Sequence, residues 1–72
     1  MSYGTVRWFN QKIGAGFIRT DDGENVSFLN STVQESDRSS LQKDARVFLE
    51  VLKSQYGLAA INVRIVEWLA TT

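Results

Sequence analysis

Short runs of alternating apolar and polar residues cover most of the chain, and clusters of turn-forming residues separate them. Alternation with a period of two is typical of strands that bury one face. Five such segments are predicted, rich in Thr, Val, Ile, Trp and Phe, as strands usually are. Their limits are Tyr3–Asn10, Ala15–Thr20, Asn25–Leu29, Arg46–Lys53 and Leu58–Val66. No long stretch shows the helical period of about 3.6 residues, so the sequence predicts an all-β fold.

Turn signals separate the predicted strands. Asp21-Asp22-Gly23 is typical of a hairpin turn, because glycine adopts positive φ easily and aspartate tolerates it. Ser54-Gln55-Tyr56-Gly57 forms a second turn. Residues 30–45 are polar apart from Val33 and Leu41, which predicts a long loop with one short helical turn at its start.

The alternation also separates inward from outward side chains. In the second strand, Ile18 lies on the inward face and Phe17 on the outward face. The predicted core comprises Val6, Ile18, Val26, Phe28, Val33, Val47, Leu49, Val51, Ile61, Val63 and Ile65, with Phe9 at its margin. Five short strands with one apolar face expose their edges unless the sheet closes. The expected architecture is therefore a five-stranded antiparallel Greek-key barrel of the oligonucleotide/oligosaccharide-binding type.

The amino-acid composition limits the number of domains and the kinds of chemistry that the chain can carry out. The 72 residues predict one domain over 1–72, with its core at about 3–66 and a frayed tail at 67–72. The chain has no Cys and no His, which excludes disulfides and a catalytic thiol and argues against zinc chemistry. Neither a nucleophile–base pair nor a phosphate-cradling loop is recognisable. We therefore expect a binding domain rather than an enzyme, with no cofactor and no metal.

No apolar run approaches the roughly 20 residues that a membrane span requires, and the first residues do not resemble a signal peptide. The expected location is the cytoplasm, with no membrane partner. The 8 basic and 8 acidic residues balance, which argues against binding by phosphate neutralisation alone. Stacking of bases on aromatic rings needs no net charge, so nucleic-acid binding stays open.

Aromatic, basic and glycine residues interleave over the first two predicted strands. Gly4–Asn10 reads Gly-Thr-Val-Arg-Trp-Phe-Asn, and Gly14–Ile18 reads Gly-Ala-Gly-Phe-Ile. A third segment, Gly57–Val63, leads from a turn into a strand of small residues. Together these segments resemble the cold-shock domain family, and the resemblance extends over residues 4–65.

The resemblance implies a barrel that binds single-stranded RNA or DNA, as an RNA chaperone or a regulator of transcription or translation. It places Trp8 and Phe17 at positions where bases stack and Arg7 at a basic position. The expected nucleic-acid-binding residues are Arg7, Trp8, Asn10, Lys12, Phe17, Arg38 and Tyr56. The Asn10 amide would hydrogen-bond a base or sugar. Lys12 and Arg38 would contact phosphate, and Tyr56 would add a ring, although all three also fit a solvated surface.

Several stacking positions are changed. The family's Lys-Gly-Phe/Tyr-Gly-Phe reads Ile13-Gly14-Ala15-Gly16-Phe17 here, and its Val-Phe-Val-His-Phe reads Val26-Ser27-Phe28-Leu29-Asn30. The lost rings correspond to Ala15, Ser27, Leu29 and Asn30. Phe28 is expected to face the core, so its ring does not replace a lost one. Stacking on an aromatic ring contributes about 1–3 kcal/mol per base. We expect weakened or altered base preference.

The first strand contains a conflict between pattern and resemblance. Strict alternation places Val6 and Trp8 on the same face, whereas the resemblance requires Val6 inside and Trp8 outside. A bulge near Arg7 would reconcile the two. Gly14 and Gly16 either serve turns and bulges or let a ligand approach the backbone closely.

A different function is also compatible with the sequence. The barrel could have lost most nucleic-acid binding and act through a protein partner or as a homodimer. The apolar surface for this alternative would comprise Ile13, Leu29, Phe48 and Leu52.

Overall fold

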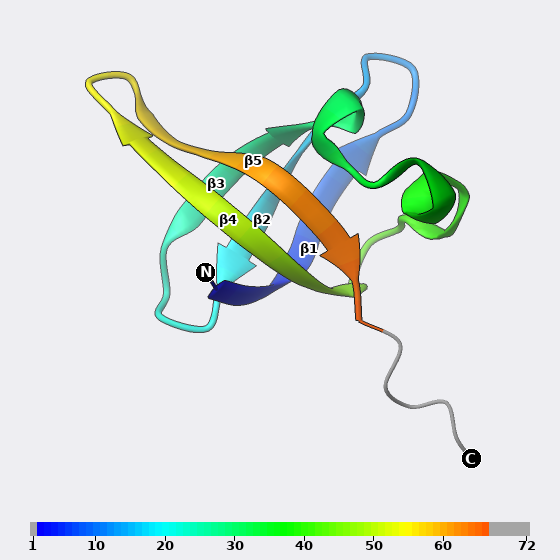
Figure 1. Ribbon diagram of the computed structural model, residues 1–72, viewed down its shortest axis with the longest axis horizontal. Coiled ribbons are helices and arrows are strands. Elements are labelled where there is room, and N and C mark those ends of the chain that lie inside the picture. Colours follow the sequence, from blue (N-terminus) through cyan, green and yellow to red (C-terminus); the bar gives the residue numbers. More distant parts are fainter. Residues whose placement is uncertain (1, 67–72) are drawn as a thin grey trace.

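Five strands close into a barrel in the computed structural model, which describes residues 2–66 (Figure 1). The strands are β1 (Ser2–Asn10), β2 (Ala15–Thr20), β3 (Asn25–Leu29), β4 (Arg46–Ser54) and β5 (Gly57–Ile65). Their order around the barrel is β1-β2-β3-β5-β4, with β3 and β5 parallel and the other neighbours antiparallel. The predicted all-β barrel is confirmed. The predicted tail, 67–72, lies outside the described residues.

The segment between β3 and β4 packs beside one end of the barrel (Figure 1). It contains two 3-10 helices, η1 (Asn30–Thr32) and η2 (Glu35–Ser40); the first is the predicted helical turn, and the second was not expected. A bridge between Val33 and Val63 holds the segment to β5, and the Leu41 side chain is buried. Within residues 2–66, no helix has the length and apolar character needed to cross a membrane.

A bulge at Arg7 resolves the conflict in β1. Val6 pairs with Ile18 and Trp8 pairs with Phe17, so Arg7 is the extra residue in the ladder. The extra residue shifts the alternation by one position. Val6 is consequently fully buried, whereas Trp8 is 44% exposed. The bulge therefore turns Trp8 out of the core.

A second bulge corrects one core prediction. Glu50 pairs with Asn62 and Val51 pairs with Ala60, so Ile61 is left out of the ladder. The prediction that Ile61 belongs to the core is wrong, because the bulge turns its side chain outward, where it is 48% exposed. Ala60 takes the inward position instead.

The rest of the core follows the alternation. The buried hydrophobic residues are Val6, Ile18, Val26, Phe28, Val33, Leu41, Val47, Leu49, Ala60 and Val63. Val51 and Ile65, predicted as core, are only partly buried and pack against this cluster. Phe9 lies at the margin, as expected, and its ring stacks on that of Phe28 at a centroid distance of 5.6 Å.

One ion pair joins the β2–β3 turn to β4. The guanidinium of Arg46 donates to both carboxylate oxygens of Asp21, at 2.7 and 3.1 Å. These hydrogen bonds hold the pKa of Asp21 below its usual value of 3.8 and raise the pKa of Arg46. The pair therefore stabilises the fold only while Asp21 is ionised.

We expect this pair to give the protein part of its sensitivity to acid. Because the pKa of Asp21 is lower in the folded than in the unfolded chain, its contribution is complete above about pH 4 and is lost as the pH falls through the folded value. Asp21→Asn should lower the thermal midpoint at pH 6 by a few degrees at most, and this difference should shrink as the pH falls below the usual pKa of 3.8. Thermal unfolding across that range measures it. Asp22→Asn, a neighbouring carboxylate with no ion-pair partner among residues 2–66, is the control, and an equal response of both variants would contradict the assignment.

Candidate nucleic-acid interface

Two aromatic rings lie side by side on the outside of β1 and β2. Trp8 and Phe17 are ladder partners, and their ring centroids are 6.0 Å apart with the planes tilted by 41°. Trp8 is 44% exposed and Phe17 is 49% exposed. Large rings exposed together on a small domain are typical of a binding surface.

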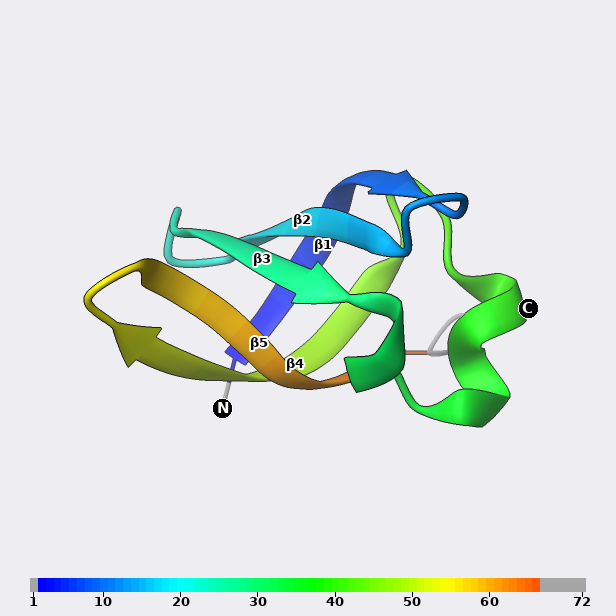
Figure 2. The ribbon, with the colours of Figure 1, turned by 90° about the horizontal axis from the view of Figure 1, so that it is seen from above.

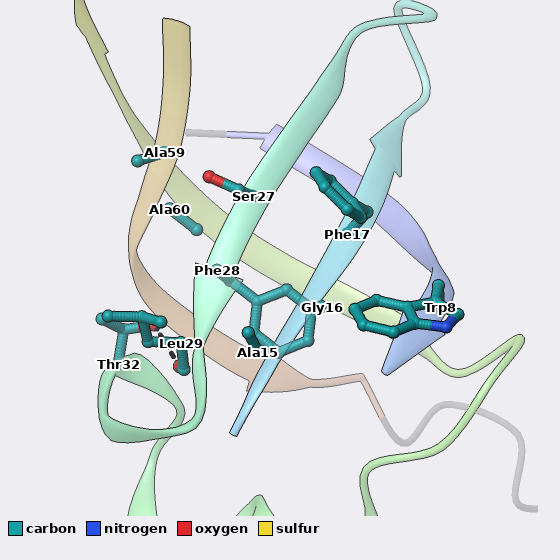
Figure 3. A pocket seen from close by; sticks show the side chains of 10 residues that line it. All are labelled: Trp8, Ala15, Gly16, Phe17, Ser27, Phe28, Leu29, Thr32, Ala59 and Ala60. Atoms are coloured by element: carbon teal, nitrogen blue, oxygen red, sulfur yellow. Dashed lines mark hydrogen bonds between the residues drawn. The ribbon is translucent and has the colours of Figure 1, made fainter. Parts of the chain in front are cut away.

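A hollow of about 330 Å³ adjoins the two rings (Figure 3). Its floor includes the buried ring of Phe28, and the small side chains of Ala15 and Ser27 leave the space above the floor open. Leu29 forms the rim opposite Trp8. We call this space the ring hollow. It occupies positions at which the family resemblance places further rings.

The two hydroxyl groups that line the ring hollow already donate hydrogen bonds. The Ser27 hydroxyl donates to the Leu58 carbonyl at 3.3 Å, and the Thr32 hydroxyl donates to the Leu29 carbonyl at 2.7 Å. The remaining lining consists of aromatic, aliphatic and glycine residues. The hollow therefore suits the apolar face of a flat group better than its hydrogen-bonding edge.

Exposed small and apolar residues extend this surface around the barrel. Cross-strand pairing joins five outward positions in one row, Trp8, Phe17, Ser27, Ala59 and Leu52. The row runs from β1 through β2, β3 and β5 to β4. Aromatic side chains occur in this row only on β1 and β2.

The charges beside the rings are all basic. β1 and β2 contain Arg7 and Arg19 and no acidic residue, and Lys12 lies in the turn between them. None of these three cations forms an ion pair among residues 2–66. The surface of β1 and β2 is therefore basic, although the net charge of the whole chain is zero. Such a surface suits an anionic ligand. Arg19 was not among the predicted site residues, although its position two residues after Phe17 placed it on the same outward face.

Asn10 closes the turn between β1 and β2. Its side-chain oxygen accepts hydrogen bonds from the backbone N–H groups of Lys12, at 2.9 Å, and Ile13, at 3.3 Å. The turn then requires a left-handed residue, which Gly14 supplies with φ of 67°. Gly14 is thus a turn glycine. The side-chain oxygen of Asn10 thus accepts hydrogen bonds within the turn, and its NH₂ group is the part of the side chain that can donate to a ligand.

Arg38 and Tyr56 are not among the residues that line the ring hollow. Arg38 is half-buried, and its guanidinium donates to the carbonyls of Val33, at 3.1 Å, and Ser31, at 3.4 Å. These bonds anchor the loop before β4. Tyr56 is 90% exposed in the turn between β4 and β5. The structure thus brings Trp8 and Phe17 together, with Arg7 next to Trp8 at the bulge in β1, but it places neither Arg38 nor Tyr56 in the hollow.

The four apolar residues predicted to form a protein-docking or homodimer surface do not line one common hollow. Leu29 lines the ring hollow, whereas Phe48 lines a separate one on β4 and β5. Ile13 is 65% exposed in the turn between β1 and β2, and Leu52 stands at the far end of the outward row.

A closed five-stranded barrel has the architecture of the oligonucleotide-binding type, and its paired outer rings lie beside cations that form no ion pair among residues 2–66, as expected of a nucleic-acid-binding member of that class. The family model of the 'Cold-shock' DNA-binding domain matches residues 2–66. The chain belongs to this family.

Similar proteins of known name support the assignment. The chain is 38% identical over 63 residues to the major cold shock protein of Streptococcus pyogenes serotype M6, covering 88% of this chain and 94% of that protein. It is 42% identical over 65 residues to the cold shock-like protein CspA of Stigmatella aurantiaca, covering 89% and 96%. It is 36% identical over 64 residues to the cold shock protein CspC of Bacillus subtilis, covering 89% and 97%.

Proposed function

We propose that this protein binds single-stranded RNA or DNA on the face formed by β1, β2 and β3. Trp8 and Phe17 stack bases, Arg7 and Lys12 contact phosphates, and the Asn10 NH₂ group hydrogen-bonds a base or sugar. The observation that carries the proposal is the half-exposed pair of rings, 6.0 Å apart, beside the ring hollow and among cations without ion-pair partners in residues 2–66. Arg38 and Tyr56 contribute at most peripheral contacts, because the Arg38 guanidinium is bonded to the Val33 and Ser31 carbonyls and Tyr56 lies in the turn between β4 and β5.

We further propose that binding is weaker, and less dependent on base identity, than a full set of rings would give. Ala15 and Ser27 present no ring to a base, and the hydroxyl of Ser27 is occupied by the Leu58 carbonyl. Each missing stack removes about 1–3 kcal/mol. The cellular role that accords with the family resemblance is RNA remodelling or control of transcription or translation in the cytoplasm.

Tryptophan fluorescence tests the proposed face directly. In a Trp68→Phe background, Trp8 is the remaining one of the two tryptophans. An oligothymidine of about six bases should quench its emission saturably at low salt, with a midpoint below about 10 micromolar. Added salt should weaken binding, because phosphate contacts release counterions.

Substitution of the rings provides the control. Phe17→Ala should weaken binding about tenfold or more by removing one stacking platform, whereas Tyr56→Ala should change it less than twofold. Absence of quenching at about 100 micromolar would sink the proposal and leave a protein partner as the remaining function.

A further inference from the structure

A second aromatic pair lies where β1 meets β4, away from the ring hollow. Figure 2 shows β1 running from the side of the barrel that carries β4 to the side that carries β2. Tyr3 and Phe48 are ladder partners there, and their ring centroids lie 4.9 Å apart with the planes at 56°. Tyr3 is 49% exposed, and the guanidinium carbon of Arg46 lies 5.8 Å from its ring centroid. The function proposed above uses none of these side chains.

A smaller hollow opens beside Phe48. It measures about 210 Å³ and is lined by Phe48, Leu49, Glu50, Asn62 and Arg64. Phe48 and Arg64 are ladder partners, so the ring and the exposed guanidinium come from adjacent positions. Glu50 accepts a hydrogen bond from the Asn62 amide at 2.7 Å. Arg64 forms no ion pair among residues 2–66. A ring beside such a cation is the combination that holds a base and its phosphate.

Arginines connect this hollow to the rings of Trp8 and Phe17. Arg7 follows Thr5 by two positions on β1, and Thr5 is flanked across the ladder by Arg19 on one side and Arg46 on the other. Arg46 stands two positions before Phe48 on β4. Of the acidic residues beside this path, Asp21 is paired with Arg46, and Glu50, in the lining of the smaller hollow, accepts a hydrogen bond from Asn62. A basic path therefore crosses the outside of β1 between the two aromatic surfaces.

We propose that a single-stranded nucleic acid longer than the ring hollow follows this arginine path and stacks one further base on Phe48, with a phosphate on Arg64. Tyr3 positions Phe48 by packing against its ring. The proposal rests on the proposed function and extends it to a second contact surface. A protein partner fits this hollow less well, because the centres of protein interfaces are depleted of charge and this hollow is lined by Glu50 and Arg64.

Two oligothymidines of different length test the proposal. One, of about six bases, covers the ring hollow alone, and the other, of about twelve bases, reaches both surfaces. Phe48→Leu keeps the apolar volume but removes the ring, and should weaken binding of the longer strand about tenfold while leaving the shorter one within twofold. Fluorescence anisotropy of labelled strands measures both affinities.

The charge variant gives an independent readout. Arg64→Ser should weaken only the longer strand and reduce its salt dependence by about one phosphate contact. Lys43→Ser removes the same charge from an exposed loop position that lines neither hollow, and should leave both strands unchanged. If Phe48→Leu fails to fold by circular dichroism, Arg64→Ser, on the surface of β5, decides the question.

The outcomes separate the two proposals. If the wild type binds neither strand, the proposed function fails and this extension fails with it. Two outcomes would refute only the second surface, provided that the wild type binds the short strand. In one, each variant weakens binding of the short and the long strand equally; in the other, neither variant changes the binding of either strand. A change in sedimentation mass of Phe48→Leu without any change in strand affinity would show that this hollow docks a second copy of the chain instead.

Discussion

The Gly16→Ala variant is expected to lose about 3 kcal/mol or more of its free energy of unfolding. An added Cβ would collide with the backbone oxygen of Trp8 and would lie 2.8 Å from Cε1 of the Phe28 ring. Neither neighbour can yield easily, because one is backbone and the other is 3% exposed in the core. A domain of this length has about 4–11 kcal/mol of stability, so the loss is a large part of the total.

Urea unfolding measures this effect, and the midpoint should fall while the slope stays constant. The thermal midpoint should drop by about 12 °C or more, at about 4–8 °C per kcal/mol for a domain of this size. Gly14→Asn is the matched control. Gly14 has φ of 67°, which asparagine tolerates, and an added Cβ there meets only the Asn30 Cβ at 3.6 Å. Equal losses in both variants would contradict a steric role specific to Gly16.

The alternation of residue types predicted the strands because one face of each strand is buried. Strand ends agree to within one residue, and β2 and β3 keep the period of two without interruption. Val26 and Phe28 lie inside, and Ser27 and Leu29 lie outside, as the pattern indicated. Gly16, predicted either as a bulge glycine or as a point of close ligand approach, lines the ring hollow, and an added Cβ there would meet the Trp8 carbonyl and the Phe28 ring.

Register could not be predicted where a ladder gains a residue. The residue types around the bulges at Arg7 and Ile61 are those of an ordinary strand. The alternation within one β-strand therefore does not reveal either bulge. The family resemblance required the first, because Trp8 had to face outward. Nothing in the sequence required the second, and Ile61 was consequently placed in the core.

The candidate site was predictable only in part. Trp8 and Phe17 carried the motif and do form one surface. The depth of the ring hollow depends on how five strands curve around the missing side chains, which sequence spacing does not specify. Arg38 illustrates the same limit, since its bonds to the Val33 and Ser31 carbonyls arise from the path of the loop.

Restoring rings at the ring hollow is expected to strengthen nucleic-acid binding. Ala15 pairs with Leu29 and Ser27 pairs with Phe17, and both side chains line the open hollow. Ala15→Phe or Ser27→Phe should each raise affinity for an oligothymidine about tenfold, since one stack contributes about 1–3 kcal/mol. The double variant should gain up to about a hundredfold, and less if both rings meet the same base.

Competition between labelled strand and variant at constant salt measures this gain. Ala15→Leu supplies apolar volume without a ring, and should raise affinity by less than about threefold if stacking rather than burial holds the base. The salt dependence should stay that of the wild type, because neither substitution adds a charge. A weaker affinity in the double variant, with Trp8 quenching retained, would mean that the bound base enters the hollow and is displaced by the added rings that fill it. The small residues at these two positions would then be the binding determinant, and weakened stacking would be the wrong account of this site.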